Sequence, residues 1–289
     1  MMNTNKKGIL LAILAAALYA ISTPISKILL AEIPPTLLAA FLYLGAGMGM
    51  SVIGIARKAN GKVSEEEKLE RSDLPYVIAM IILDIAAPIL LLLGLSTATP
   101  ENVSLLNNFE IVATALIALL FFGEKISKRL GLAIGLITLA SFILSFESIE
   151  AFEFSFGSLL VIAAACCWGL ENNCTRKLSS KDPLQIVIVK GLCSGVGSLI
   201  IGFAIGEKIE NYWYVVAAIV LGFVAYGLSI FTYVYAQRMI GAARTSAYYA
   251  IAPFIGSTIS LLLFPKIPEI TFFAAVLVMG VGSYLASKE

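Results

Sequence analysis

The side chains that could do chemistry in this sequence lie inside long apolar stretches. Asp84, Glu110, Glu171, Lys190 and Lys27 each interrupt segments that otherwise consist almost entirely of uncharged residues. A charge at the centre of a membrane-spanning helix costs about 2.5–3.5 kcal/mol on insertion scales, so charged residues persist there chiefly where they serve a function. Carboxyl groups in such places could hold a proton or the amino group of a small solute.

Glu110 is the strongest candidate for a binding residue. Asn107 precedes it by one helical turn on the same face, and no basic residue close in the sequence neutralises it. We expect Glu110, Asn107 and Asp84 to contact the substrate in a central cavity, and Glu110 or Asp84 to carry a coupled proton. Glu171 and Lys190 fall in adjacent apolar segments at depths that allow an ion pair, which could serve coupling or only packing.

Aromatic residues are expected to line the same cavity. Tyr19 and Trp168 stand at matching places in the two halves of the chain, and Tyr248 would approach from the ninth apolar segment. Amphipathic aromatic rings with a few fixed polar groups suit small organic ligands. Tyr248 and Tyr249 cannot both face one cavity, because consecutive helical residues point about 100° apart. The sequence leaves open which of the two does so.

Glu124 and Lys27 are the candidates for a gate or a cytoplasmic ion-pair network. Glu124 is followed by the basic residues Lys125, Lys128 and Arg129. Lys27 lies near a helix end, where a lysine can also extend along the helix to reach the membrane surface. Its role therefore stays open between the two.

The elements that position these residues are predicted to be membrane-spanning helices. Of 289 residues, 59% are hydrophobic and only 13% are charged, against about 25% charged in soluble domains. A span needs about 20 apolar residues, and its backbone groups must be satisfied within the segment, which favours helices. Apolar windows predict ten spans, at about 8–30, 36–56, 75–95, 102–122, 130–147, 157–177, 184–206, 212–236, 243–264 and 270–286.

Basic residues predict the orientation of these spans. With a cytoplasmic amino terminus, most lysines and arginines fall in the inner connections, as positive-inside topology requires. The sequence therefore predicts an all-α, multi-pass protein of the cytoplasmic membrane with both termini in the cytoplasm.

Several function classes are excluded or disfavoured. The chain has no histidine, so histidine-based zinc sites and Ser-His-Asp triads are ruled out. The four cysteines lie in apolar stretches without a C-x-x-C pair, and we expect neither a metal nor another cofactor. The net charge of +1 offers no nucleic-acid footprint. The expected partners are the bilayer and a small-molecule substrate; the oligomeric state is open, and a monomer would suffice.

The two halves of the chain resemble each other. Residues 1–149 and 150–289 would each hold five spans, and an odd number places the two repeats in opposite orientations. Gly45-x-x-x-Gly49 in one half and Gly191-x-x-x-Gly195 in the other allow close helix contacts. Inverted repeats are typical of secondary transporters, which bind substrate near the midplane at the repeat interface. Lipid-modifying enzymes, intramembrane proteases, receptors and channels remain the alternatives, and their usual signatures are missing.

In these residues the chain resembles the ten-helix EamA-type family of the drug/metabolite transporter superfamily. The resemblance rests on Tyr19-Ala20 followed by Lys27, on Phe121-Phe122-Gly123-Glu124, and on Trp168-Gly169 followed by Arg176. It covers nearly the whole chain, although Ile111 stands where the family usually has proline, and Pro265-Lys266 replaces the second Gly-Glu. The resemblance implies secondary transport of small metabolites such as amino acids, commonly export, by alternating access around a central cavity.

Overall fold

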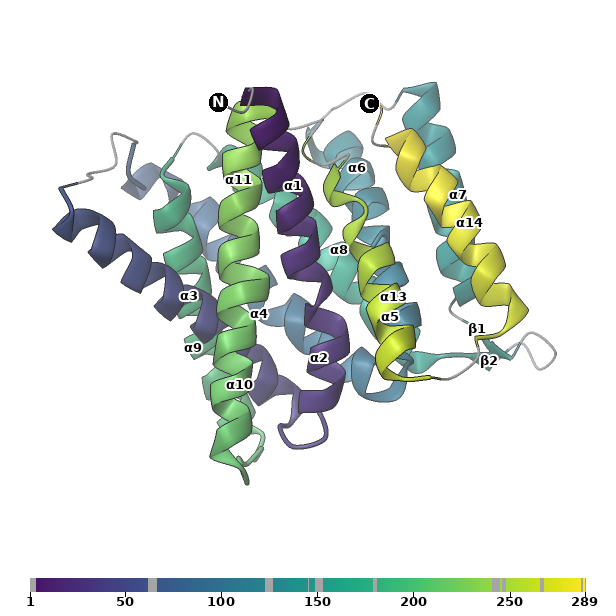
Figure 1. Ribbon diagram of the computed structural model, residues 1–289, viewed down its shortest axis with the longest axis horizontal. Coiled ribbons are helices and arrows are strands. Elements are labelled where there is room, and N and C mark those ends of the chain that lie inside the picture. The colour runs from purple at the N-terminus through teal and green to yellow at the C-terminus, as the bar shows by residue number, and fades with distance from the viewer. Residues whose placement is uncertain are drawn as a thin grey trace.

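The computed structural model describes residues 4–61, 67–122, 127–144, 146–148, 153–178, 181–240, 245, 248–265, 268–286 and 288. In this part of the chain the fold is helical apart from a short antiparallel hairpin of two strands, β1 and β2 (Figure 1). The elements are α1 (Thr4–Ala20), α2 (Ser22–Leu29), α3 (Pro35–Ala59), η1 (Arg71–Asp73), α4 (Leu74–Thr97), α5 (Pro100–Leu106), α6 (Phe109–Phe122), α7 (Lys128–Leu144), β1 (Phe146–Ser148), β2 (Glu153–Phe154), α8 (Phe156–Lys177), α9 (Pro183–Ala204), α10 (Tyr212–Gly222), η2 (Phe223–Leu228), α11 (Ser229–Ile240), α13 (Ala252–Leu263) and α14 (Ile270–Ala286).

The helices are those of a multi-pass membrane protein. Within the described residues, six helical stretches are long and apolar enough to span a bilayer, and α13 and α14 are shorter apolar helices. Large apolar side chains lie on the outside, for example Ile270, Leu262 and Leu120, which are 84%, 77% and 74% exposed. Polar side chains are buried instead, with Asp84 fully inaccessible. An exterior this rich in large apolar side chains is unlike that of a water-soluble protein and fits a protein solvated by lipid.

The helices pack in pairs that join the two halves of the chain. The helix α3 packs on α9, α4 on α8, α1 on α11, α5 on α13, and α7 on α14. Matched in chain order, α1, α3, α4, α5 and α7 of the first half correspond to α8, α9, α11, α13 and α14 of the second. When each helix is replaced by its counterpart, the α1–α11 pair becomes the α8–α4 pair, and the other three pairs stay the same. The first helix, α1, begins at the end of the bundle where the last helix, α14, finishes, whereas α8 begins at the opposite end, beside the hairpin (Figure 1).

Glycines permit the closest of these contacts. A Cβ atom on Gly191 of α9 would lie 2.4 Å from the backbone nitrogen of Gly47 in α3, and one on Gly222 would lie 1.9 Å from the carbonyl oxygen of Leu42. Such distances are below any real contact, so the α3 backbone is in contact with both α9 and α10. Close approach of this kind supplies the dispersion attraction that holds helices together in lipid.

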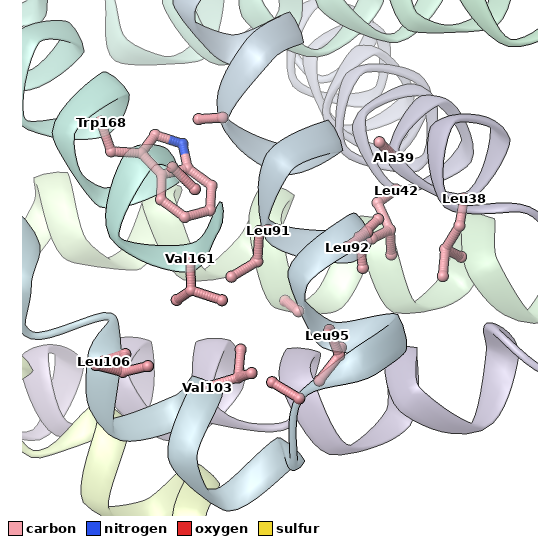
Figure 2. Packing of buried hydrophobic residues seen from close by; sticks show 14 of the residues in the cluster. Leu38, Ala39, Leu42, Leu91, Leu92, Leu95, Val103, Leu106, Val161 and Trp168 are labelled. Atoms are coloured by element: carbon pink, nitrogen blue, oxygen red, sulfur yellow. The ribbon is translucent and has the colours of Figure 1, made fainter. Parts of the chain in front are cut away.

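An apolar cluster fills the space between α3, α4 and α8. Figure 2 shows Leu91 pointing from α4 toward Val161 and Trp168 of α8, while the adjacent Leu92 points toward Leu42 of α3. These side chains are at most 7% exposed. The cluster therefore fixes the relative position of the three helices, and with it the position of the charged residues that they carry.

Several helices are interrupted deep in the bundle. The first span changes from α1 to α2 at Ile21, and α5 passes to α6 through a tight turn at Asn107 and Asn108. A π-helical stretch, η2, separates α10 from α11. Pro24 and Pro253 have no backbone N–H to give to the carbonyls of Ala20 and Tyr249, four residues earlier. Broken helices in membrane proteins are tolerated where the backbone is buried in protein or lines a cavity.

The predicted fifth span ends early. The apolar window predicted a helix to about residue 147, but α7 ends at Leu144, and Phe146 pairs with Phe154 in the hairpin. The apolar run continues past the helix because Phe146 is a strand residue of the connection, which hydropathy alone does not distinguish from a helical one.

The contact at Gly222 can be tested by adding a single methyl group. Gly222→Ala places a Cβ against the backbone of Leu42, which cannot move without displacing α3. We expect an apparent loss of about 1–3 kcal/mol of stability, the usual cost of overpacking. The measurement is the thermal unfolding midpoint of the purified protein in detergent. Gly135→Ala is the matched control, because nothing lies within 4 Å of its added Cβ; an equal midpoint for both variants would contradict the assignment.

Candidate functional site

The centre of the bundle holds a three-residue ion-pair cluster. The Nζ atom of Lys190 on α9 lies 3.1 Å from Oδ2 of Asp84 on α4 and 3.1 Å from Oε1 of Glu171 on α8. Asp84 and Glu171 are buried, and the lysine side chain is 12% exposed. The expected Glu171–Lys190 pair is present, and Asp84 joins it. Sequence analysis missed this partner, although Asp84 and Lys190 are both charges within otherwise apolar helices.

Hydrogen bonds complete the surroundings of the two carboxylates. The Tyr43 hydroxyl donates to Oδ1 of Asp84 at 2.9 Å, and the Thr175 hydroxyl donates to Glu171. One ammonium group thus faces two carboxyl groups. A buried charge is tolerated when it is paired and hydrogen-bonded, but here one carboxyl is in excess. With both carboxyl groups ionised, the cluster carries one net negative charge, which a proton or a bound cation would neutralise.

Glu110, on α6, has an amide partner on α8. Its Oε1 accepts a hydrogen bond from Asn172 Nδ2 at 2.5 Å, and the same amide lies 3.4 Å from the Thr114 hydroxyl. No basic side chain among the described residues lies within ion-pair distance of Glu110. Asn172 follows Glu171 directly, so α8 supplies one residue to the ion-pair cluster and the next residue to Glu110. The two polar centres therefore share this helix.

A group of tyrosines connects these centres. The rings of Tyr43 and Tyr226 are 5.3 Å apart, those of Tyr226 and Tyr19 are 5.9 Å apart, and Tyr19 lies 6.0 Å from Tyr249. Tyr233 of α11 packs edge-on against Tyr249 at 4.9 Å. Tyrosine rings bury apolar area while their hydroxyls can bond to polar ligands. The tyrosines therefore form an aromatic path from the ion-pair cluster toward the helix breaks.

A small polar cavity, here called the break cavity, lies where three broken spans meet. Its volume is about 10 Å³, which corresponds to a single water molecule. It is lined by Tyr19, Ala20, Thr23, Ser104, Asn107, Ala252, Pro253 and Gly256. The Oγ atom of Ser104 and the Oδ1 atom of Asn107 are buried there without a hydrogen-bond partner. Both atoms would be costly to bury if nothing ever bound to them.

A larger cavity opens at the end of the bundle away from the start of α1. It has a volume of about 300 Å³ and lies between the ends of α4 and α7 and the beginnings of α5, α8 and α14. Glu101 and Glu269 are among its lining residues, and Glu101 is only 5% exposed. This cavity lies beside the break cavity, along the α5 helix.

The structure distributes the other predicted residues as follows. Asn107 and Tyr19 line the break cavity. Trp168 lies in the apolar cluster beside Leu91 (Figure 2). Tyr248 was expected to line the cavity, with the choice between it and Tyr249 left open; in the structure it is Tyr249 that packs against Tyr19 and Tyr233.

The two predicted gate residues have different outcomes. Lys27 is bonded to the backbone: its Nζ donates to the carbonyls of Leu95, Ser96 and Ala98, at 2.5, 3.2 and 3.1 Å. These are the last carbonyls of α4, so Lys27 caps that helix and opposes the negative end of its dipole. Glu124 lies outside the described residues.

The donor set of the site suits hard cations, protons and ammonium groups. The described residues hold no cluster of three or more His, Cys, Asp or Glu side chains that could bind a metal ion. The central groups are carboxylates, amides and hydroxyls. The geometry is that of a helical membrane protein with a charged, aromatic interior at the meeting point of broken helices, as in proteins that carry small solutes.

Comparison with known proteins identifies the family. The EamA-like transporter family matches the chain twice, over residues 6–146 and residues 155–288. The chain therefore belongs to the EamA-like transporter family, within the drug/metabolite transporter superfamily. The family is one of membrane transporters, which favours transport over the enzyme and receptor alternatives.

Two relatives and one solved structure extend this comparison. An uncharacterized transporter of Methanothermobacter thermautotrophicus is 27% identical over 275 residues, which cover 89% of this chain and 79% of the relative. The uncharacterized transporter YyaM of Bacillus subtilis is 22% identical over 229 residues, 74% of this chain and 73% of the relative. A solved crystal structure shares the fold with a TM-score of 0.69 at 16% identity, covering 96% of this chain and 95% of that one.

Removing the shared ammonium group tests the ion-pair cluster. Lys190→Met leaves Asp84 and Glu171 facing each other in the protein interior, and breaking a buried pair in this way costs about 3–5 kcal/mol. We expect a clearly lower thermal unfolding midpoint in detergent, partly restored when Asp84→Asn is added. Lys208→Met, at an exposed position, is the control. A Lys190→Met midpoint equal to that of the control would show that the cluster does not stabilise the fold.

Proposed function

We propose that the protein is a secondary transporter that moves a small organic solute bearing an amino group, such as an amino acid, across the cytoplasmic membrane by alternating access. The observation that carries the proposal is the convergence of three broken spans on a polar interior that also holds Glu110 and the Asp84–Lys190–Glu171 cluster. Discontinuous helices supply free backbone groups for substrate and ion binding at the midplane of transporters.

The arrangement of the two halves supports alternating access. The family matches each half separately, and the pairing of helices is unchanged when the halves are exchanged. The first helices of the halves enter from opposite ends (Figure 1). We infer ten spans in two inverted repeats, residues 1–149 and 150–289, with both termini in the cytoplasm. Two such repeats can exchange conformations, which opens the central site to each side in turn.

The balance of charges supports a substrate with an amino group. Asp84, Glu171 and Glu110 offer three carboxyl groups, whereas Lys190 is the one basic group paired with them among the described residues. Ionising all three would leave two negative charges inside the membrane at high cost. Bound protons or an ammonium group would neutralise them, and release of either on one side would couple charge to the conformational cycle. Export is the direction that we favour.

The substrate class can be found through ligand-induced stabilisation. A ligand that binds only the folded protein raises its stability by RT ln(1 + [L]/Kd), about 2.7 kcal/mol at a hundredfold excess over Kd. We would screen the detergent-purified protein against amino acids, polyamines, nucleosides, sugars and organic cations. A raised midpoint with amino compounds, followed by their flux in proteoliposomes, is the expected result. Stabilisation by sugars or nucleosides alone would contradict the proposed class.

Neutralising Glu110 tests its role in transport. Glu110→Gln keeps the shape and the hydrogen bond to Asn172 but removes the charge and the exchangeable proton. We expect solute flux in proteoliposomes to fall at least tenfold while the thermal midpoint stays within a few degrees of that of the unaltered protein. Glu32→Gln, at an exposed position in the connection after α2, is the control. Full flux in the Glu110→Gln protein would refute the assignment.

A further inference from the structure

We propose that the break cavity is a binding site for a dehydrated Na⁺ ion. The inference deepens the proposed function, because a cation bound there would be the coupling ion, and it rests on that function only for the coupling. The site itself is argued from the oxygens that the structure brings together around a space of about 10 Å³.

The first argument is the set of oxygens left without partners. Ser104 and Asn107 line this space, and neither Oγ of Ser104 nor Oδ1 of Asn107 has a hydrogen-bond partner. The two residues are 2% and 7% exposed. The carbonyl oxygen of Ala20 lacks a helical donor, because Pro24 has no N–H to give. An electron-pair acceptor or a proton donor placed among these oxygens would satisfy them.

The second argument is proximity. A Cβ atom placed on Gly256 would lie 3.0 Å from the carbonyl oxygen of Ala20 and 3.2 Å from Oγ of Ser104. Both oxygens therefore lie close to one point beside the backbone of α13. Only glycine at position 256 leaves that point open, and Thr23 brings a further hydroxyl to the same cavity.

The third argument concerns charge and size. No lysine or arginine lines the cavity, and Glu110 lies one turn beyond Asn107 without a basic partner in the described part of the chain. Neutral oxygens favour a hard monovalent cation, since Ca²⁺ and Mg²⁺ sites normally include carboxylates. A dehydrated Na⁺ ion is smaller than a water molecule and therefore fits a space of this size, and K⁺, which is about as large as water, is the comparison ion in the test.

The test is the thermal unfolding midpoint of the full-length protein in detergent, measured in NaCl, KCl and choline chloride at equal ionic strength. We expect a saturable rise of the midpoint in NaCl over the other two salts. In Ser104→Ala and Gly256→Ala, the Na⁺ concentration that gives half of the rise should increase at least tenfold. Gly280→Ala is the matched control, because its added Cβ meets no atom closer than 4.0 Å; it should respond as the unaltered protein does.

Equal midpoints in the three salts would overturn the inference, as would a Na⁺ response that survives in both Ser104→Ala and Gly256→Ala. The second result would mean that Na⁺ acts elsewhere and that the cavity holds water. Solute flux is measured separately in proteoliposomes. Flux without a Na⁺ response refutes the cation site and leaves the transporter proposal standing. A Na⁺ response without flux of any tested solute supports the cation site and contradicts the transporter proposal.

Discussion

The ion pair from Lys190 to both Asp84 and Glu171 is the interaction on which the interior of this protein depends. It joins α4, α8 and α9, and these helices carry most of the charge that the membrane would otherwise reject. Without the lysine, two carboxyl groups would face each other in a medium that cannot hydrate them. With the lysine in place, Tyr43 of α3 donates a hydrogen bond to Asp84, and the surrounding helices pack against one another through apolar side chains.

Close packing of the helices surrounds this polar centre. In lipid, helices gain nothing from hiding apolar surface, so they are held by contact and by buried polar bonds. Gly191 and Gly222 bring the backbones of α9 and α10 against α3. Buried charges that are close together interact more strongly than they would in water. The glycine contacts thus hold α9 and α10 against α3, beside the helices that carry the charged cluster.

The class of fold could be predicted from the sequence, because long apolar segments indicate directly which parts of the chain are surrounded by lipid. The pairing of Glu171 with Lys190 was also accessible, since two opposite charges in adjacent apolar segments have few other ways to be tolerated. Asp84 was predicted as a cavity residue but not as the third member of the cluster, because helix adjacency between α4 and α9 is a tertiary fact. The sequence left the role of Lys27 open, and its partners in the structure are backbone carbonyls at the end of α4, which no side-chain pattern reveals. The choice of Tyr249 over Tyr248 likewise depends on helix rotation.

Glu171 and Asn172 suggest how binding at one centre would reach the other. They are consecutive residues of α8, one bonded to Lys190 and the other to Glu110. Any rotation of α8 that shortens one contact must change the other, because the helix is rigid over a single residue. A charge change at Glu110 therefore acts on the same helix that Lys190 holds. The breaks at Ile21 and Asn107 provide the compliant points around which the flanking helix segments could respond, while the glycine contacts of α3 keep the remainder in place. Coupling of this kind requires a helix shared by two polar centres, and α8 is that helix.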